Sequence, residues 1–143
     1  MTVKAILDAK GRDVVTVEPT MTLAQAARLL SEKRIGAVVV AKEGSKIAGI
    51  LSERDIVRQI ALRGAAALDE AISSAMTARV KTCQEGHTVN QVMEIMTRGR
   101  FRHLPVEREG RLAGIVSIGD VVKQRIEDVE READEIRHYI ATA

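Results

Sequence analysis

Two short stretches of the chain place a serine three residues before an aspartate, each directly after a run of apolar residues. They are Ser52 to Asp55 and Ser117 to Asp120. Where an apolar strand ends and a helix begins, free backbone N–H groups and a partial positive charge lie beside the serine hydroxyl and the aspartate carboxylate. This combination is suited to holding a sugar phosphate.

Helix capping is the alternative explanation for the same residues. Ser-x-x-Asp is close to the Ser-x-x-Glu capping box, which starts many helices without binding anything. A single copy would favour capping alone, because a short motif is weak evidence for a site. Two copies in equivalent places shift the balance towards a binding site.

An internal repeat sets these two stretches in equivalent places. Thr22 and Thr88 each open a Thr-x-x-Gln capping box and stand 66 residues apart, whereas Ser52 and Ser117 stand 65 residues apart. One residue is therefore missing from the intervening turn of the second half, and the pattern indicates a duplication. Each half is too small to bury its own sheet, so we expect the halves to pack together about a pseudo-twofold axis.

Hydrophobic periodicity predicts strand, helix, strand, strand and helix in each half. The last helix of the first half should turn Ile56, Val57 and Ile60 inwards. We expect a short amphipathic turn before the first half and a short helix at the joint before the second. The segments lie at residues 2–8 (turn), 14–17 (strand), 22–33 (helix), 37–40 and 47–51 (hairpin), 52–63 (helix) and 68–76 (joint).

The last helix carries an apolar stripe with the spacing of a coiled-coil seam. We expect this stripe to pair with a second chain, because it extends over roughly three heptads. Packing back onto its own body is the alternative. The residues of the stripe are Val122, Ile126, Val129, Ala133, Ile136 and Ile140.

Composition disfavours several classes of function. The chain has 143 residues, 45% of them hydrophobic, and its net charge of +2 gives no support to a nucleic-acid or membrane-surface role. It has no apolar run of about 18 residues and no signal-peptide pattern, which predicts a cytoplasmic protein. No Cys/His cluster has zinc spacing, so no metal site is expected, and Cys83 is predicted to be a core residue on a strand.

The motifs together resemble those of a tandem pair of CBS (cystathionine β-synthase) domains, from Val3 to about Asp128. The resemblance implies an α/β (α+β) fold of two pseudo-twofold-related β-α-β-β-α repeats. Each repeat would hold a small three-stranded sheet and two helices, with a long C-terminal helix added. The expected divisions are residues 1–65, 66–128 and 129–143. The stretches that carry the resemblance are Val14 to Pro19, Ile47 to Asp55 and Arg102 to Val106.

Clefts between the halves that bind adenosine-containing ligands are a further implication of the resemblance. The candidates are AMP, ADP, ATP, NAD(H) and S-adenosylmethionine. The chain looks like a stand-alone regulatory module that acts in signal transduction as a homodimer, through an effector protein that the sequence does not identify. A ligand-independent dimeric interaction protein is the alternative. An enzyme is not expected, because the sequence shows no phosphate loop, zinc site or carboxylate pair.

By the same resemblance, the ribose ligands fall on Ser52, Asp55, Ser117 and Asp120. An ionised aspartate accepts both ribose hydroxyl protons, and strand backbone reads the adenine edge without aromatic rings. Phe101 and Tyr139 are the only aromatic residues, so an adenine ring would lie between aliphatic walls. The adenine-contacting positions are the backbone of Thr16, Val17, Thr82 and Cys83, with walls from Ile35, Val38, Ile50, Leu104, Pro105 and Ile115.

The two repeats differ where a phosphate would lie. Arg54 stands inside the first motif, where it could reach a phosphate, whereas Ile118 and Gly119 stand in the second motif, whose site must find its charge elsewhere. The second repeat also carries Arg100, Arg102 and His103, and the last two are the leading phosphate ligands by resemblance. Their alternative roles are a solvated surface charge for Arg102 and a structural histidine for His103. The sequence leaves open which cleft these groups serve, and it predicts two unequal sites.

Overall fold

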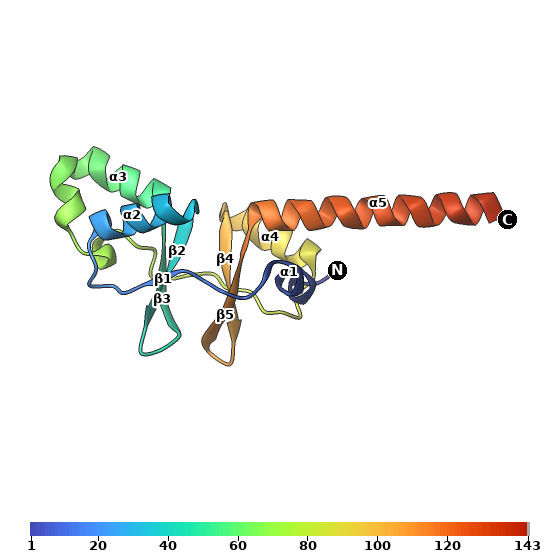
Figure 1. Cartoon of the computed structure of the whole chain (residues 1–143), viewed down its shortest axis with the longest axis horizontal. Coiled ribbons are helices and arrows are strands. Elements are labelled where there is room, and N and C mark those ends of the chain that lie inside the picture. Colours follow the sequence, from blue (N-terminus) through green and yellow to red (C-terminus); the bar gives the residue numbers. More distant parts are fainter. Residues whose placement is uncertain (143) are drawn as a thin grey trace.

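The structure, a computed structural model, describes residues 1–142. Its elements form two related runs joined by two short 3-10 helices, and a long helix ends the chain (Figure 1). The predicted fold class is therefore confirmed. In chain order the elements are α1 (Val3–Lys10), β1 (Thr16–Val17), α2 (Leu23–Lys33), β2 (Ala37–Lys42), β3 (Lys46–Ser52), α3 (Glu53–Arg63), η1 (Gly64–Asp69), η2 (Ile72–Ser74), α4 (Val89–Gly99), β4 (His103–Arg108), β5 (Arg111–Ser117) and α5 (Ile118–Thr142).

The first repeat contains a three-stranded sheet in the order β1-β2-β3. Strand β1 pairs with β2 in parallel, and β2 pairs with β3 in the antiparallel sense. All residues of β2 except the last are buried, as expected for a strand covered on both faces. Helix α2 begins at the predicted capping box of Thr22 and Gln25, and its apolar face joins the same core.

The two hairpins confirm the predicted deletion. Three residues separate β2 from β3, whereas two residues separate β4 from β5. Each turn begins with a glutamate followed by a glycine, and both residues of each pair have positive φ angles: Glu43 and Gly44 in the first turn, Glu109 and Gly110 in the second. Positive φ at successive positions is the conformation that tight hairpins require.

The second repeat has a two-stranded sheet in place of the predicted three-stranded one. Its first strand is reduced to a single parallel bridge between Cys83 and Val106. In the first repeat, the N–H of Val39 donates to the carbonyl of Val15 at 3.3 Å. The residue equivalent to Val39 is Pro105, which has no N–H to donate, so the ladder cannot extend in the same way.

The segments that precede the repeats are exchanged in space. Residues 3–8 lie in helix α1 and not in a turn, and Val3, Ile6 and Leu7 belong to the core of the second repeat. The joint forms two 3-10 helices instead of the predicted helix, and Ile72 belongs to the core of the first repeat. Each repeat thus receives an apolar segment that the sequence places before the other.

Two equivalent glycines accommodate these exchanged segments. A Cβ atom on Gly114 of β5 would lie 2.9 Å from Leu7 Cδ1, and a Cβ atom on Gly49 of β3 would lie 2.7 Å from the carbonyl oxygen of Thr77. Glycine at these positions therefore allows a helix or an extended segment to approach the strand closely.

Two helices leave apolar residues uncovered. On α3 only Ile56 is buried, whereas the side chains of Val57 and Ile60, predicted to face inwards, are 65% and 37% exposed. Helix α5 extends well beyond the body of the molecule (Figure 1), and the five large apolar residues of its stripe are between 45% and 68% exposed. The stripe therefore does not pack back onto its own chain. Among residues 1–142, no helix combines the length and apolarity needed to cross a membrane.

Candidate functional site

The first Ser-x-x-Asp stretch forms the corner between β3 and α3. The Ser52 hydroxyl accepts a hydrogen bond from the Asp55 N–H at 3.3 Å, and Asp55 Oδ2 accepts from the Ser52 N–H at 2.9 Å and from the Ser52 hydroxyl at 3.0 Å. This is a full capping box, so the capping role is confirmed. The bonds occupy one carboxylate oxygen; the other, Oδ1, lies 3.8 Å from Arg58 Nη1, beyond hydrogen-bonding distance.

A cavity of about 450 Å³ opens beside this corner and is lined by both repeats. Its volume lies within the range of small-molecule sites, which are roughly 300 to 1,000 Å³. Four arginines and two carboxylates are among its lining residues. The first repeat contributes Gly36, Ala37, Ile50, Ser52, Glu53, Arg54, Asp55 and Arg58, the joint contributes Thr77, and the second repeat contributes Gly99, Arg100, Phe101, Arg102 and His103.

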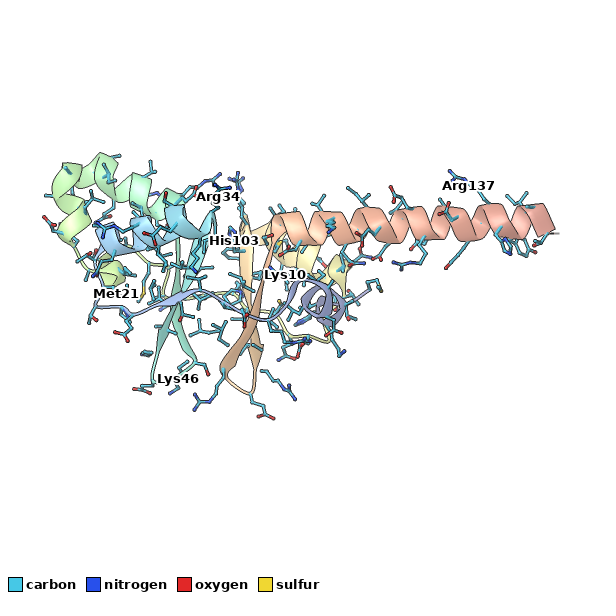
Figure 2. The ribbon with its side chains drawn as sticks, in the orientation of Figure 1. Lys10, Met21, Arg34, Lys46, His103 and Arg137 are labelled. Carbon is cyan, nitrogen blue, oxygen red and sulfur yellow. The ribbon has the colours of Figure 1, made fainter. Side chains whose placement is uncertain are left out.

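The predicted phosphate ligands of the second repeat therefore line the same cavity as the predicted ribose ligands of the first repeat, where Arg54 also lies. Arg100 adopts a left-handed conformation that ends α4 and turns the chain towards β4. His103, the first residue of β4, lies where the two repeats meet (Figure 2). A Cβ atom on Gly36 would lie 3.5 Å from His103 Cε1, an ordinary contact distance, so Gly36 of the first repeat lies directly beside the imidazole of the second.

The electrostatic surroundings of His103 favour its neutral form. Burial lowers the pKa of His103 below its ordinary value, and the positive charges of Lys10 and Arg102 act in the same direction. Asp120 and Glu53 oppose the shift, but the net direction is downwards. At neutral pH the imidazole can thus offer one N–H donor and one acceptor, while the arginines supply the positive charge.

The second Ser-x-x-Asp stretch has the same capping geometry and a different neighbour. Asp120 Oδ2 accepts from the Ser117 N–H at 2.8 Å, and the Ser117 hydroxyl accepts from the Asp120 N–H at 3.1 Å. Lys10 Nζ donates to the same Asp120 oxygen at 2.7 Å. Burial works against ionisation of Asp120, but the hydrogen bonds from Lys10 and Ser117 outweigh it, so the pKa of Asp120 is below its ordinary value.

Most of the predicted adenine-contacting residues lie away from the cavity at Ser52 and Asp55. Thr16 and Val17 line a separate cavity of about 480 Å³ beside the hairpin residues 41–44. Thr82 donates its hydroxyl hydrogen bond to Glu107 at 3.0 Å.

Of the predicted wall residues, only Ile50 lines the first cavity. Val38, Cys83, Leu104 and Pro105 are buried, and Ile35 packs against the first core. Their contact with adenine stays a prediction.

Several residues of the two sites were missed by the sequence reasoning. Thr77 lines the first cavity because its backbone pairs with Ile50, and Arg58 lies one helical turn after Arg54. The spacing of Arg54 and Arg58 could have predicted that Arg58 lies beside Arg54, since residues four apart share a helix face. Lys10 could have been found only by assigning the first helix to the second repeat, which required the tertiary structure.

The comparison with protein families agrees with the duplicated fold. The model of the CBS domain family matches residues 3–62 and 71–127. The chain belongs to the CBS domain family. This CBS pair spans 66%, 60% and 58% of the length of three curated relatives from Acidianus ambivalens, Arabidopsis thaliana and Methanopyrus kandleri, to which it is 37%, 33% and 34% identical.

Solved structures share the arrangement of this CBS pair. A CBS-domain containing protein from Agrobacterium tumefaciens is 55% identical, with a TM-score of 0.85, over 87% of this chain and 99% of that one. The CBS domain protein PAE2072 from Pyrobaculum aerophilum, solved with AMP, is 28% identical (TM-score 0.75; 84% and 89% covered). The CBS domain pair of protein MJ0100, solved with 5′-methylthioadenosine and S-adenosylmethionine, is 25% identical (TM-score 0.80; 90% and 98% covered).

Proposed function

We propose that this CBS pair is a regulatory module that binds an adenine nucleotide, with AMP as the first candidate, in the cavity beside Ser52 and Asp55. One observation carries the proposal: the carboxylate of Asp55 and the guanidinium groups of Arg100 and Arg102 come from different repeats and line one cavity. A nucleotide is complementary to these groups, because its ribose hydroxyls can donate to the carboxylate and its anionic phosphate can accept from the cations.

The charge of the lining favours phosphorylated ligands. Arg54, Arg58, Arg100 and Arg102 outnumber Glu53 and Asp55, so the cavity complements a phosphate dianion better than the positive sulfonium of S-adenosylmethionine. The two ligand-bound relatives, one with AMP and one with 5′-methylthioadenosine and S-adenosylmethionine, share the adenosine group. ADP, ATP and NAD(H) carry both an adenosine group and phosphates, and they are the next candidates.

A ligand in this position can transmit a signal because it touches both repeats. A nucleotide that binds one relative arrangement of the repeats more tightly shifts the population towards that arrangement. Helix α5 begins directly after Ser117, so a change in the packing of the second repeat reaches the extended helix. An effector protein of unknown identity would respond to this change in the helix.

Calorimetric titration of the nucleotide-stripped full chain with AMP, ATP, NADH and S-adenosylmethionine tests this proposal. We expect AMP to bind more tightly than S-adenosylmethionine. Asp55→Asn should weaken the tighter AMP site at least about tenfold, because it replaces a charged acceptor while keeping an oxygen for the cap. The matched control is Asp134→Asn, an exposed aspartate on α5. Equal AMP affinity in the wild type and Asp55→Asn would contradict the assignment.

The exposed apolar residues of α3 and α5 support a homodimer. Val57 and Leu62 on α3, and the stripe from Val122 to Ile140 on α5, present large apolar side chains to solvent. The heptad spacing of the stripe suits a second copy of the same helix. Ile126→Glu should convert the dimer to a monomer in sedimentation equilibrium, whereas Lys123→Glu, on an exposed polar position nearby, should not. An unchanged mass for Ile126→Glu would exclude this surface as the interface.

A ligand-independent interaction protein is the competing function, and the same stripe supports it. This alternative predicts a folded dimer that binds none of the four ligands.

A catalytic role is not proposed. The Cys83 thiol is buried, and burial raises its pKa to about 12, so it is protonated at neutral pH and unsuited to nucleophilic attack. Nucleotide hydrolysis that is lost in His103→Ala would overturn the non-catalytic assignment.

A further inference from the structure

Helix α5 carries two different apolar or buried faces. The face that packs against the body holds the buried residues of the helix, Val121, Gln124 and Asp128. The stripe from Val122 to Ile140 lies about a third of a turn away from that face, and its five large side chains are 45% to 68% exposed. The helix extends well past α1 and α4 (Figure 1), and a second helix can lie along the stripe without displacing the body.

The heptad spacing of the stripe determines which charged residues border it. Steps of three and four residues place Ile126, Ala133 and Ile140 at the core position a, and Val122, Val129 and Ile136 at the core position d. The positions that flank such a seam, e and g, set the orientation of the two helices. Along the stripe they are occupied by Lys123, Glu130 and Arg137 (position e) and by Arg125, Glu132 and Tyr139 (position g).

A parallel pair of α5 helices would bring opposite charges together. In this orientation each g residue lies opposite the e residue of the following heptad on the other helix. Arg125 would face Glu130 of the second copy, and Glu132 would face Arg137, which projects from the extended part of the helix (Figure 2). Within residues 1–142, Arg125, Glu130 and Glu132 belong to no ion pair of α5, so their charges are available to a second chain.

An antiparallel pair would bring like charges together. In the antiparallel register that overlaps the whole stripe, Val122 meets Ile140, Glu130 faces Glu130 of the second copy, and Glu132 faces Glu132. A shift by one heptad removes this repulsion, but it leaves the two apolar residues at one end of each stripe uncovered. The charges and the apolar residues therefore favour the parallel orientation together.

We propose that α5 pairs with α5 of a second copy in the parallel orientation, with contacts from Arg125 to Glu130 and from Glu132 to Arg137 between the chains. This inference rests on the homodimer proposed above and specifies its interface. Both CBS bodies would then lie at the same end of a two-helix rod. Since α5 begins directly after Ser117 in each copy, a ligand-induced shift in one body would reach the other through the paired helices.

Disulfide trapping in the full chain tests the orientation. Ile140→Cys, combined with Cys83→Val, places the two introduced thiols opposite each other in the parallel pair, where the Cα atoms come within the limit of about 7 Å for a disulfide. In the full antiparallel register the same positions lie roughly 27 Å apart. We expect mild oxidation to give a covalent dimer. The matched control is His138→Cys, an exposed position on the side of the helix away from the stripe, which should stay unlinked.

A charge reversal tests the contacts between the chains. Glu130→Arg would face Arg125 of the second copy and should weaken dimerisation at least about fivefold in sedimentation equilibrium at low salt. Within its own helix the new arginine gains Glu127 and Asp134 as neighbours of opposite charge, so a less stable helix would not explain the loss. Adding Arg125→Glu should restore the affinity. Glu127→Arg, the same reversal away from the seam, is the matched control and should leave dimerisation unchanged.

The outcomes separate this inference from the homodimer itself. A dimer that does not cross-link through Ile140→Cys would contradict the parallel orientation, and a dimer that keeps its affinity in Glu130→Arg would contradict the assigned contacts. In both cases the homodimer would stand. A monomeric wild type would contradict both proposals. Should Ile140→Cys weaken the dimer, Ile136→Cys repeats the trapping one turn earlier, where the antiparallel separation is still roughly 15 Å.

Discussion

The two Ser-x-x-Asp corners have nearly the same local geometry and very different surroundings. At both, a serine caps a helix and an aspartate three residues later accepts from the serine N–H. The first corner faces a cavity lined by arginines of both repeats, whereas the second corner bonds the lysine of an exchanged helix. A duplicated motif therefore fixes the cap, whereas segments from elsewhere in the fold set the charges that surround it.

The largest expected effect concerns the helix that distinguishes the corners. Leu7→Ala should lower the free energy of unfolding by about 3 kcal/mol, because it leaves a cavity at a fully buried position in the core of the second repeat. Chemical denaturation measures the loss, with the exposed Leu62→Ala as the control. A loss for Leu7→Ala as small as that of the control would mean that α1 is not part of this core.

The equivalent glycines of the two repeats give a direct comparison. Gly49→Ala should cost about 2 kcal/mol and Gly114→Ala about 1 kcal/mol, since overpacking is worse where the obstacle cannot move. The added methyl at position 49 meets the backbone oxygen of Thr77, whereas at position 114 it meets the side-chain end of Leu7. Thermal and urea unfolding of both variants would rank them, and the opposite order would refute the reasoning.

A smaller effect on stability is expected from the protonation of Asp120 at acid pH. Because the folded-state pKa of Asp120 is below its ordinary value of 3.8, its ionised form contributes stability at neutral pH that is lost as the pH falls through the folded-state pKa. Asp120→Asn should therefore destabilise the chain by up to about 1 kcal/mol at pH 7. The difference from the wild type should shrink by pH 3, and a difference that grows in acid would contradict the predicted sign.

The smallest expected effect tests the equivalence of the two cores. Cys83 of the second repeat stands where the first repeat has Val17, and both residues are buried. Cys83→Val should change the free energy of unfolding by less than about 1 kcal/mol, because the exchange stays apolar and the equivalent position of the first core already accommodates a valine. Differential scanning calorimetry would measure it. A large loss would show that the two cores differ more than their backbones do.

The sequence predicted those features that depend on neighbouring residues. The capping boxes at Thr22, Ser52 and Thr88, the two hairpins and the missing turn residue are all present. Capping and turn formation need only residues a few positions apart, which is why pattern reading found them.

Features that depend on distant segments were not predictable in the same way. Val57 has a helical apolar spacing that predicts burial, but no segment of the described chain covers it. The shortened strand near Cys83 follows from a proline on the adjacent strand, and Lys10 reaches Asp120 only because α1 crosses to the other repeat. These outcomes were decided by tertiary contacts, which override local pattern.

The exchange of helical segments also affects the order in which the protein is completed during synthesis. Domains generally fold as units as the chain emerges from the ribosome. The first repeat has all its parts once residue 77 has emerged, since its borrowed segment directly follows it. Helix α1 precedes both repeats in the chain but finds its core partners only when residues as late as Val121 are made. The apolar face of α1 therefore stays uncovered until both repeats have been synthesised.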